Sequence, residues 1–567
     1  MNGDMDLFPF PSARRGQADF LRDARDCAIE GKVLVAHAPT GLGKTAVALT
    51  ASLEAALADG GRTVFLTPRQ SQHRAVIETV KMMPRPIGTV DLLSRESMCP
   101  HGPRSPCLEG KKCHLQADGR ITQCAREILG RPVHAQELVA LCLRRGACPY
   151  LSAKMASSGA DLVVGDISRV FSDLPDVIRF RSSSRKQHLV ADEAHNLPSR
   201  IMDAFSRDLV LEPGSDDPLQ AVWREMLSRG HRLIPFGELR SLLDRRGLPE
   251  PEELAEMDDR VDDWMRLGEA AVRVAYPNEG RISLRFLEPD LVVQNVVREC
   301  RGAIFMSGTL HPPQVFAARM GLTDAECRSY PSPFDPARRL ALVVPDVGTR
   351  FRDRCRRTTL EMALRIGELS ETVPGNVMVF LPSYTYMSAV HRALRRLGQR
   401  KLLLSESPLM SKADRDGLAD LLGGEREVLM LCNIRGSFSE GVDLPAGCLS
   451  AVMVGGLPLT PPGLERQEMI ARASSRIGGY DLDTYEALSR VLQACGRAIR
   501  REEDRAAVVL MDPRYLERKV LKMLPPDLVL SEGDPTELLG EFFGNPLETA
   551  WKHQPEGERI LTGHGLP

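Results

Sequence analysis

The sequence predicts an α/β protein with two domains built on parallel sheets and with insertions in the first of them. Three observations predict this fold. Residues 33–58 contain a short buried strand, a glycine-rich loop and an apolar helix, an order typical of a sheet that binds phosphate. Strands and helices alternate again between residues 376 and 459, without a second glycine-rich loop. Six cysteines fall within residues 99–148, which indicates a separate inserted element.

Length and composition are those of a globular protein with several domains. At 567 residues the chain is too long for one hydrophobic core, and its 26% charged and 43% hydrophobic residues are ordinary values. No apolar run approaches the roughly 18 residues that would span a membrane, and the first residues, MNGDMDLF, do not resemble a signal peptide. We therefore expect an intracellular protein, cytoplasmic in a prokaryote or nuclear in a eukaryote, with reduced cysteines.

The glycine-rich loop APTGLGKT is predicted to hold the phosphates of a nucleotide. Gly41 and Gly43 allow a tight turn whose N–H groups face an anion, and the following helix adds its positive end. Lys44 would reach the β- and γ-phosphates, and the Thr45 hydroxyl would bind Mg²⁺. The strict motif has glycine where this chain has Ala38, so a glycine-rich loop without a nucleotide remains an alternative. The predicted contacts are Ala38, Pro39, Thr40, Gly41, Leu42, Gly43, Lys44 and Thr45.

Two further strands end in polar residues of the kind that an ATPase needs. The strand at residues 63–66 precedes Arg69 and Gln72, which are candidate contacts to a nucleic-acid backbone because ligands bind at the carboxyl ends of parallel strands. The strand in HLVADEAHNL ends in Asp192 and Glu193. Asp192 would hold the Mg²⁺ and Glu193 would polarise the attacking water. The alternative, a charged cap on a strand, is disfavoured by the glycine-rich loop upstream.

The cysteine-rich segment is also basic. Residues 99–154 contain nine Lys or Arg against four Asp or Glu, in a chain whose formal net charge is −2, so this segment is a plausible surface for nucleic acid. Zinc sites usually have short CxxC pairs, and none occurs here. Wider and uneven spacing favours an iron–sulfur cluster held by four thiolates. Reduced cysteines scattered through a small core are the remaining alternative.

The rest of the chain reads as an insertion followed by a second α/β domain. Residues 198–289 are expected to be mainly helical, with eight acidic residues and one arginine at residues 248–264. The strand in AIFMSGTL ends in Ser307, Gly308 and Thr309, small groups suited to linking the nucleotide site to a second ligand. PSPFDP, at residues 331–336, resembles a linker into the second domain.

Two loops in the second domain are predicted to carry chemistry. One is RGSFSEGVDLP at residues 435–445, and the other is QACGRAIRREED at residues 493–504. In the second, Gln493, Arg497 and Arg500 have spacings of four and three, which would place them on one face of a helix. Two arginines directed at a γ-phosphate form an arginine-finger arrangement. A solvated basic helix is the alternative, which the apolar neighbours disfavour.

Together these motifs resemble one family. APTGLGKT, DEAH, MSGTL, FLPSYTYM, RGSFSEGVD and QACGRAIR stand in the order of a superfamily 2 helicase. The SGTL, PSY, SEGVD and QxxGRxxR forms, with a cysteine insert before DEAH, resemble the XPD-like and DinG-like DNA helicases. Ala38 is usual in that family. The resemblance covers residues 8 to about 515 and implies two RecA-like parallel-sheet domains with an iron–sulfur insertion and a helical arch-like insertion in the first.

The resemblance also implies ligands and contacts. Cys99 and Cys148 match the first and last ligands of a 4Fe–4S cluster, and Cys107 and Cys113 are preferred for the middle pair, with Cys124 as a possible substitute and Cys142 as a helix-face residue. Asp166 stands where relatives often have Asn or His, so a DNA contact there is in doubt. The nucleotide would also contact Gln17, which reads the adenine edge, and Gly441, Asp443 and Gln493. The DNA contacts implied in the second domain are Ser383, Tyr384 and Arg435.

The implied function is an ATP-dependent DNA helicase that moves 5′ to 3′ along single-stranded DNA and unwinds duplex in DNA repair. ATP would lie between the RecA-like domains, with Arg497 and Arg500 closing over it. Single-stranded and forked DNA are the expected partners of a monomer with ATP, Mg²⁺ and the cluster. An ATP-gated redox-sensing clamp and a DEAH-type RNA helicase are alternatives. The domains are predicted at residues 1–98, 149–197 and 290–312 (first RecA-like), 99–148 (cluster), 198–289 (arch-like) and 313–567 (second RecA-like).

Overall fold

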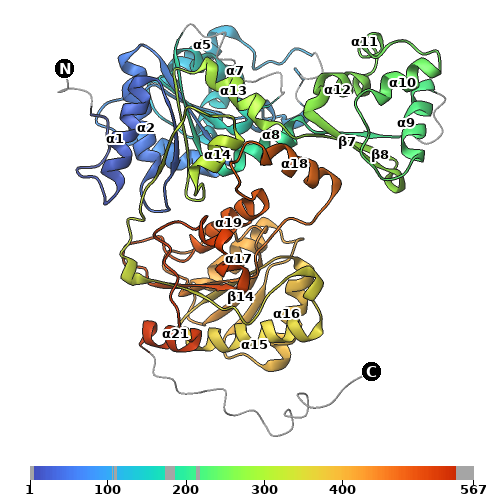
Figure 1. The fold of residues 1–567 in the computed structure, drawn as a ribbon. Coiled ribbons are helices and arrows are strands. Elements are labelled where there is room, and N and C mark those ends of the chain that lie inside the picture. The colour runs from blue at the N-terminus through green and yellow to red at the C-terminus, as the bar shows by residue number, and fades with distance from the viewer. Residues whose placement is uncertain (1–5, 105, 108–110, 173–184, 212–216, 545–567) are drawn as a thin grey trace. The chain divides into compact units, whose positions relative to one another are not determined.

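The structure, a computed structural model, describes residues 6–104, 106–107, 111–172, 185–211 and 217–544. It forms two compact units. The first contains the described residues up to Tyr330 together with Pro461–Leu482, and the second contains Pro331–Thr460 and the described residues from Asp483 onward (Figure 1). No helix in the described part of the chain is long and apolar enough to cross a membrane.

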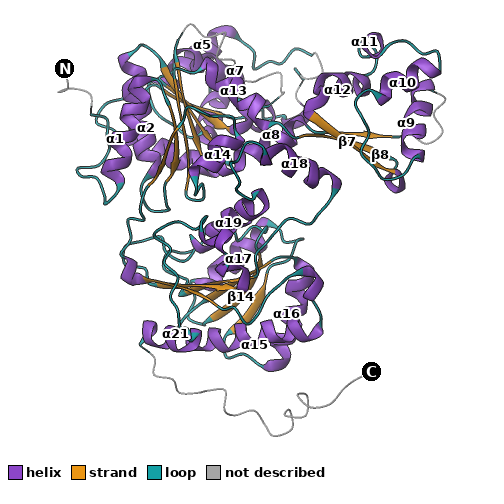
Figure 2. Cartoon of the chain, viewed as in Figure 1, coloured by secondary structure: helices purple, strands orange, loops and turns teal. Residues whose placement is uncertain are grey.

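The first unit is built on a seven-stranded parallel sheet with the strand order β10-β1-β9-β5-β2-β4-β3. The strands are β1 (Val33–His37), β2 (Arg62–Thr67), β3 (Thr89–Leu92), β4 (Leu162–Asp166), β5 (Gln187–Asp192), β9 (Gly302–Ser307) and β10 (Glu326–Ser329). Every residue of β2, β5 and β9 is buried. Strands that are buried along their whole length are typical of a parallel sheet that helices cover on both faces, as Figure 2 shows.

The helices of the nucleotide-binding half follow the strands directly. They are α1 (Gln17–Glu30), α2 (Lys44–Ala58) and α3 (Gln70–Lys81), and α1 packs closely on α2. Helix α2 is apolar on nearly all sides and is buried along most of its length. The predicted strands β1, β2, β5 and β9 and the predicted helix α2 are all present, so the parallel α/β fold of this half is confirmed.

The cysteine-rich insertion lies between β3 and β4 and is helical. It contains α4 (Arg95–Met98), η1 (Gly102–Arg104), α5 (Asp118–Leu129), α6 (Ala135–Arg144) and α7 (Pro149–Gly159). A core of its own, which includes Ile121, Cys124, Leu138, Cys142 and Tyr150, joins these helices to β3 and β4. The insertion is therefore a small packed subdomain attached to one edge of the first sheet.

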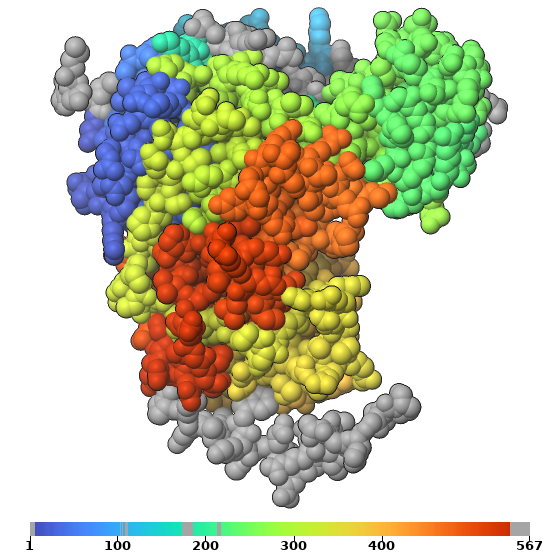
Figure 3. All heavy atoms as spheres, viewed as in Figure 1, coloured from blue at the N-terminus to red at the C-terminus, as the bar shows by residue number. Residues whose placement is uncertain are grey.

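The second insertion is rich in helices, as predicted, but it also contains an antiparallel sheet that the sequence did not predict. Strands β6 (Arg207–Val210), β7 (Ala271–Tyr276) and β8 (Arg281–Phe286) form an antiparallel sheet. Around it stand α8 (Leu197–Phe205), α9 (Pro218–Ser228), α10 (Glu238–Arg245), α11 (Pro251–Leu254), α12 (Asp259–Leu267) and α13 (Pro289–Glu299). The hairpin turns at Gly280, whose φ is 58°. Most of this insertion forms a distinct green lobe in the space-filling view (Figure 3).

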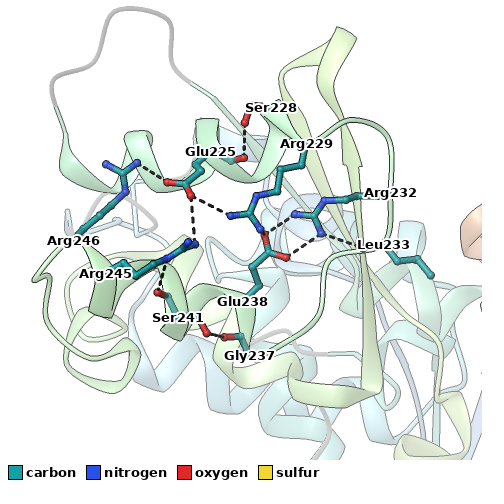
Figure 4. A network of polar contacts seen from close by, with 10 residues as sticks. All are labelled: Glu225, Ser228, Arg229, Arg232, Leu233, Gly237, Glu238, Ser241, Arg245 and Arg246. Atoms are coloured by element: carbon teal, nitrogen blue, oxygen red, sulfur yellow. Dashed lines mark hydrogen bonds and ion pairs between the residues drawn. The ribbon is translucent and has the colours of Figure 1, made fainter.

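An ion-pair network ties the helices of this lobe together (Figure 4). Glu225 pairs with Arg229 at 3.1 Å and with Arg246 at 2.7 Å, and Glu238 pairs with Arg232 at 2.5 Å. Several of these side chains are partly exposed, so each pair contributes little alone. The network joins α9, α10 and the loop between them, which indicates a structural role for these charges.

The second unit contains a six-stranded parallel sheet with the order β11-β16-β15-β12-β14-β13. The strands are β11 (Arg339–Val343), β12 (Val377–Leu381), β13 (Leu402–Ser405), β14 (Val428–Asn433), β15 (Ala451–Gly455) and β16 (Ala506–Met511). Its helices are α15 (Arg356–Thr372), α16 (Tyr384–Leu397), α17 (Lys412–Leu422), α19 (Leu482–Cys495), α20 (Arg518–Leu521) and α21 (Pro535–Phe543). This unit confirms the predicted second parallel-sheet domain.

The boundary between the units differs from the expected one at residue 312. Helix α14 (Pro313–Arg319) and strand β10 belong to the first unit, because β10 pairs in parallel with β1. The second unit begins at Pro331, where the PSPFDP segment begins. A strand of four residues such as β10 carries too little sequence signal to be assigned without its partner strand.

Helix α18 (Leu464–Ser474) also lies outside its expected domain. Although the sequence prediction places it in the second domain, it packs in the first unit beside β7. The Tyr276 hydroxyl donates a hydrogen bond to Glu465 (2.9 Å), and Arg472 pairs with Glu288 (3.1 Å). Leu464 and Met469 pack against the apolar cluster of the insertion. These contacts join residues about 180 to 190 positions apart, which explains why local sequence patterns do not reveal them.

Candidate functional site

The glycine-rich loop connects β1 to α2 at the carboxyl end of the first sheet. Gly41 and Gly43 have φ angles of 85° and 77°, a region that favours glycine. Helix α2 begins at Lys44, so its N-terminus opens onto the loop. The Ala38 N–H donates a hydrogen bond to the Ser307 carbonyl at 2.9 Å, and the Ala38 side chain is fully buried. Ala38 does not have a positive φ, so its backbone does not require the glycine of the strict motif.

Gln17 lies against this loop although it is far from it in sequence. It is the first residue of α1, and its side chain is only 2% exposed. A Cβ atom placed on Gly43 would lie 2.3 Å from the Gln17 amide nitrogen. Arg14 donates its backbone N–H to Gln17 Oε1 (2.9 Å) and its guanidinium to the Gly41 carbonyl (2.8 Å). The sequence prediction that Gln17 belongs to the nucleotide site thus has a geometric basis.

The acidic pair stands beside the lysine of the loop. Lys44 Nζ lies 3.9 Å from Glu193 Oε1. The Ser307 hydroxyl donates to Glu193 Oε2 at 2.9 Å, and His195 Nδ1 lies 2.7 Å from the same hydroxyl. Glu193 has a φ of 48°, and it is the one non-glycine residue with a positive φ among those the structure describes. Such backbone conformations are strained and persist where the surrounding contacts fix them.

The two carboxyl groups of this pair have opposite pKa shifts. Burial, with the neighbouring Glu193 charge, raises the pKa of Asp192 to about 7. Burial opposes ionisation of Glu193 as well, but the Lys44 ammonium and hydrogen bonds from His195 and Ser307 together lower its pKa below the ordinary value. Glu193 is therefore ionised and can accept a hydrogen bond from water. Mg²⁺ usually takes one or two protein oxygens besides phosphate, and Asp192 and Thr45 offer that donor set.

Sequence reasoning assigned no role to His195 and His37, which both lie near this site. His195 completes the contact between the DEAH residues and Ser307. His37 ends β1, is 2% exposed, and neither of its ring nitrogens has a hydrogen-bond partner. Burial lowers the pKa of His37 to about 3, with further contributions from His311 and Lys44. Position is the only sequence signal for either residue, because each adjoins a recognised motif.

The arginines of the second unit do not lie on a helix, which corrects the prediction from their spacing. Helix α19 ends at Cys495, so Gln493 is helical whereas Arg497 and Arg500 follow the helix in a turn. Gly496 stands at this end, where glycine lowers helix stability. Arg497 donates hydrogen bonds to the carbonyls of Ser439 (2.9 Å) and Val442 (2.7 Å). The Arg500 guanidinium makes no hydrogen bond or ion pair with any residue in the described ranges.

The other predicted residues of the second unit lie at the carboxyl edge of its sheet. Ser383 caps α16 by accepting the Tyr386 N–H (3.2 Å), and Tyr384 is the first residue of that helix. Arg435 follows β14 and donates to the Leu459 carbonyl at 3.3 Å. Gly441 has a φ of 119°, and Asp443 is exposed. The structure thus gathers these residues in loops at one edge without showing a ligand contact for any of them.

In the first unit, the predicted nucleic-acid contacts Arg69 and Gln72 stand at the start of α3. His73, on the same helix, belongs to a buried cluster of ionisable side chains. His73 Nδ1 lies 2.6 Å from Asp91 Oδ1, and His73 Nε2 lies 3.6 Å from Asp166 Oδ1. The second distance exceeds that of a hydrogen bond, so Asp166 acts on His73 mainly as a nearby charge. Asp91 Oδ2 also accepts the Ala135 N–H at 2.8 Å. Asp166 therefore has a protein partner in place of the doubtful DNA contact, and the cluster joins α3 to the cysteine-rich insertion.

This cluster predicts a pH-dependent stability. Burial alone would lower the pKa of His73, but Asp166 and Asp91 outweigh it and raise the pKa to about 9. Because the pKa in the folded state exceeds the unfolded value, the stabilisation is complete below pH ~6.5 and is lost as the pH rises through about 9. We expect the unfolding free energy of the wild type to fall by up to about 3 kcal/mol more than that of His73→Gln over this range.

Urea unfolding of the wild type and of His73→Gln at pH ~6.5 and at pH about 9 measures this difference in unfolding free energy. The matched control is His188→Gln, which removes another buried histidine that pairs with Asp59 at 3.2 Å and whose pKa burial lowers. His188 is neutral throughout this pH range, so its variant should follow the wild type. Equal pH dependence of the wild type and His73→Gln would show that His73 carries no proton in the folded protein.

The cysteines of the insertion fall into two groups. Cys124 and Cys142 are fully buried in the helical core, and burial raises the pKa of both thiols, that of Cys142 to about 12. Cys99, Cys107, Cys113 and Cys148 are half-buried instead. Burial and the nearby Cys99 and Cys107 raise the pKa of Cys148, whereas the N–H groups of Leu151 and Tyr150 at the start of α7 lower it.

This grouping bears on the predicted cluster. Cys99 and Cys107 are close enough to Cys148 to raise its pKa, and Cys148 is the N-cap of α7. In the described part of the chain, no three His, Cys, Asp or Glu side chains are arranged to hold a metal ion. Residues 108–110, between the predicted ligands Cys107 and Cys113, lie outside the described residues. The thiol donor set fits an iron–sulfur cluster, and Cys124 is a poor substitute because it packs in the apolar core.

Three family models match the chain in succession. A DEAD/DEAH box helicase model matches residues 17–98, a DEAD_2 model matches residues 94–212, and a helicase C-terminal domain model matches residues 366–529. The first covers the glycine-rich loop, the second covers the cysteine-rich insertion and the acidic pair, and the third covers most of the second sheet. Their order along the chain is that of the motifs in the sequence.

Individual proteins agree with these matches. A probable ATP-dependent helicase of Methanocaldococcus jannaschii is 22% identical over 90% of this chain and 93% of its own length. The ATP-dependent DNA helicase DinG of Photobacterium profundum is 28% identical, over 40% of this chain and 34% of its own length. A solved structure titled XPD helicase has a TM-score of 0.62 and 20% identity over 92% of this chain and its own full length, a likeness of fold. The chain belongs to the XPD-like and DinG-like family of superfamily 2 helicases.

Proposed function

We propose that the chain is an ATP-dependent DNA helicase that translocates along single-stranded DNA and unwinds duplex. The observation that carries this proposal is the placement of Lys44, Glu193 and Ser307 together at the carboxyl edge of the first parallel sheet. A lysine for phosphate and an ionised carboxylate for water are the parts that ATP hydrolysis requires. The relatives named DNA helicases support DNA as the nucleic acid. The resemblance supports 5′ to 3′ movement and a role in repair.

In this proposal the first unit binds and hydrolyses ATP. The N–H groups of the loop and Lys44 hold the phosphates, and Gln17 holds the base. Thr45 and Asp192 would hold the Mg²⁺, which neutralises phosphate charge when bound. Glu193 accepts a hydrogen bond from the attacking water, and its position is fixed by Ser307 and His195. Strain at Glu193 keeps the carboxylate directed toward the loop.

The second unit supplies positive charge and further nucleotide contacts. Arg500, whose guanidinium makes no hydrogen bond or ion pair in the described part of the chain, would be the arginine that stabilises negative charge on the γ-phosphate during hydrolysis. Arg497 fixes the loop of residues 439–442 through its carbonyl contacts. That loop carries Gly441 and leads to Asp443, and the helix before the arginines carries Gln493. Because Arg497 binds the loop that carries Gly441, a nucleotide that contacts either residue would couple its binding to movement of this loop.

DNA binds the loops at the carboxyl edges of both sheets. Arg69 and Gln72 act in the first unit, and Ser383, Tyr384 and Arg435 act in the second. Cys99, Cys107, Cys113 and Cys148 would hold a 4Fe–4S cluster, which cross-links the insertion when bound. Helix α7 favours the thiolate of Cys148 through its N-terminal N–H groups.

The test is strand displacement by the full chain on duplexes with a 5′ tail or a 3′ tail. We expect ATP-dependent displacement of the 5′-tailed duplex and little of the 3′-tailed one. Hydrolysis stimulated by DNA without displacement of either would replace this proposal with an ATP-gated clamp. Displacement confined to RNA duplexes would replace it with an RNA helicase.

A further inference from the structure

A basic segment with an exposed aromatic ring follows β11 in the second unit. Residues 350–357, RFRDRCRR, contain five arginines and one aspartate in a chain with a formal net charge of −2. Phe351 within it is 87% exposed. Aromatic residues are only 5% of this chain, so a fully displayed ring among arginines is an unusual local composition. No sequence motif assigns a role to this segment.

The Phe351 ring stands on a rigid support. The Arg354 guanidinium lies 5.8 Å from the centre of the Phe351 ring and 5.2 Å from that of Tyr386. Arg354 Nε also donates to the Thr349 carbonyl at 3.0 Å. The Thr349 N–H in turn donates to the buried Asp512 carboxylate at 3.1 Å. These contacts fix the backbone beneath Phe351, so a partner would meet a preorganised ring.

The segment adjoins residues that were predicted to bind nucleic acid. Tyr386, which contacts Arg354, donates its N–H to the Oγ of Ser383 (3.2 Å) at the start of α16. Strands β11 and β12 belong to one all-parallel sheet, so the chain leaves both strands at the same edge. Phe351 and Ser383 therefore lie at the same end of the strands, and Arg354 and Tyr386 link them through their contacts.

Two arginines of this segment are available to a polyanion. Arg356 makes no hydrogen bond or ion pair with a described residue, and it is the first residue of the 17-residue helix α15, whose N-terminus also favours anions. The Arg352 side chain is 77% exposed, and its one ion pair, with Asp353, spans 3.8 Å. Arg350 and Arg357 are occupied instead, by Glu517 and Glu361 at 3.1 and 2.8 Å.

We propose that this segment is a further binding site for single-stranded nucleic acid, in which Phe351 stacks on a base and Arg352 and Arg356 contact the flanking phosphates. The inference rests on the proposed function, which it extends from the loop at Ser383 to the edge strand of the second sheet. An aromatic ring between cations suits a ligand that alternates flat bases with phosphates. An acidic peptide would use the arginines but leave the ring without a partner.

Binding of fluorescein-labelled dT20 to the full chain tests the proposal. Phe351→Ala should weaken binding about 5- to 100-fold, because one base–aromatic stack contributes roughly 1–3 kcal/mol. Phe351→Trp should restore affinity and show emission quenched by dT20. Binding of an abasic oligonucleotide of equal length should not change in Phe351→Ala. The matched control is Leu421→Ala. Leu421 is 47% exposed and lies at the end of α17, before β14, and thus near the amino-terminal ends of the strands.

The arginines have a separate readout. Arg352→Gln and Arg356→Gln should each reduce the slope of log affinity against log salt concentration by about 0.7. Arg400→Gln, at the opposite edge, should leave the slope unchanged. Cys355 is the one exposed cysteine among the described residues, and it should be alkylated more slowly when dT20 is bound.

The outcomes separate this inference from the proposed function. If the wild type does not bind dT20, the proposed function fails and this site fails with it. If the wild type binds and unwinds but Phe351→Ala binds dT20 equally well, only this inference is overturned. Equal weakening toward dT20 and the abasic strand would also overturn it, because stacking would then play no part. Circular dichroism melting of Phe351→Ala should match the wild type, since the ring packs little against the fold.

Discussion

Glu193→Gln should bind ATP as tightly as the wild type and hydrolyse it about 1,000-fold more slowly. Glutamine keeps the size of the side chain and can still contact the Ser307 hydroxyl, so the fold of the site should persist. It cannot take a share of the proton from water, and it removes the negative charge that Lys44 faces at 3.9 Å. Steady-state phosphate release with saturating single-stranded DNA, together with titration of a fluorescent ATP analogue, measures both quantities.

Two further variants make this result specific. Glu78→Gln neutralises an exposed glutamate of α3 that pairs with Lys81 at 2.8 Å, and it should hydrolyse ATP at the wild-type rate. Ser307→Ala removes the hydrogen bond to Glu193 and should slow hydrolysis about 10- to 100-fold, since Lys44 and His195 still face the carboxylate. Persistent turnover in Glu193→Gln would assign the role of base to another residue.

Local sequence patterns predict most of the nucleotide site because that site is built from strand ends. Strand β1 occupies residues 33–37 as its apolar run indicates, and the glycine-rich loop and α2 follow without interruption. The sheet order then places β9 next to β1 and β5 next to β9. Parallel strands place their loops at one edge, so recognising the strands is enough to bring Lys44, Glu193 and Ser307 together.

What the sequence does not reveal depends on long-range contacts or on a helix end. Strand β8 alternates apolar and polar residues after a turn at Gly280, a hairpin signal that the acidic composition of the preceding residues obscures. Helix α18 packs in the first unit through ion pairs such as Arg472–Glu288 (3.1 Å), which no local pattern encodes. The spacing of Arg497 and Arg500 suits a helix, but α19 ends at Cys495, directly before Gly496, and the Arg497 side chain binds carbonyls of the neighbouring loop.

Cys148→Ser should lower the iron content from about four per chain to below one, bleach the brown colour and abolish unwinding. Cys148 is the proposed ligand with the clearest structural basis. It is half-buried and lies near Cys99 and Cys107, and the N–H groups at the start of α7 lower its pKa, partly offsetting the burial that raises it. Serine keeps the cap of the helix but offers iron a poor ligand. Iron assay, visible absorbance and strand displacement of the tailed duplex measure the three effects.

Cys124→Ser is the matched control, and it distinguishes a ligand from a core residue within the same insertion. Cys124 is fully buried beside Cys142 in the apolar core of the insertion, so its thiol is directed into the packing of the helices. The Cys124→Ser protein should therefore keep its iron and its colour, although a buried hydroxyl will lower its melting temperature. Cys113→Ser should lose iron as Cys148→Ser does. Loss of iron in Cys124→Ser with retention in Cys113→Ser would exchange these two assignments, and a colourless wild type holding one zinc would exclude the iron–sulfur cluster.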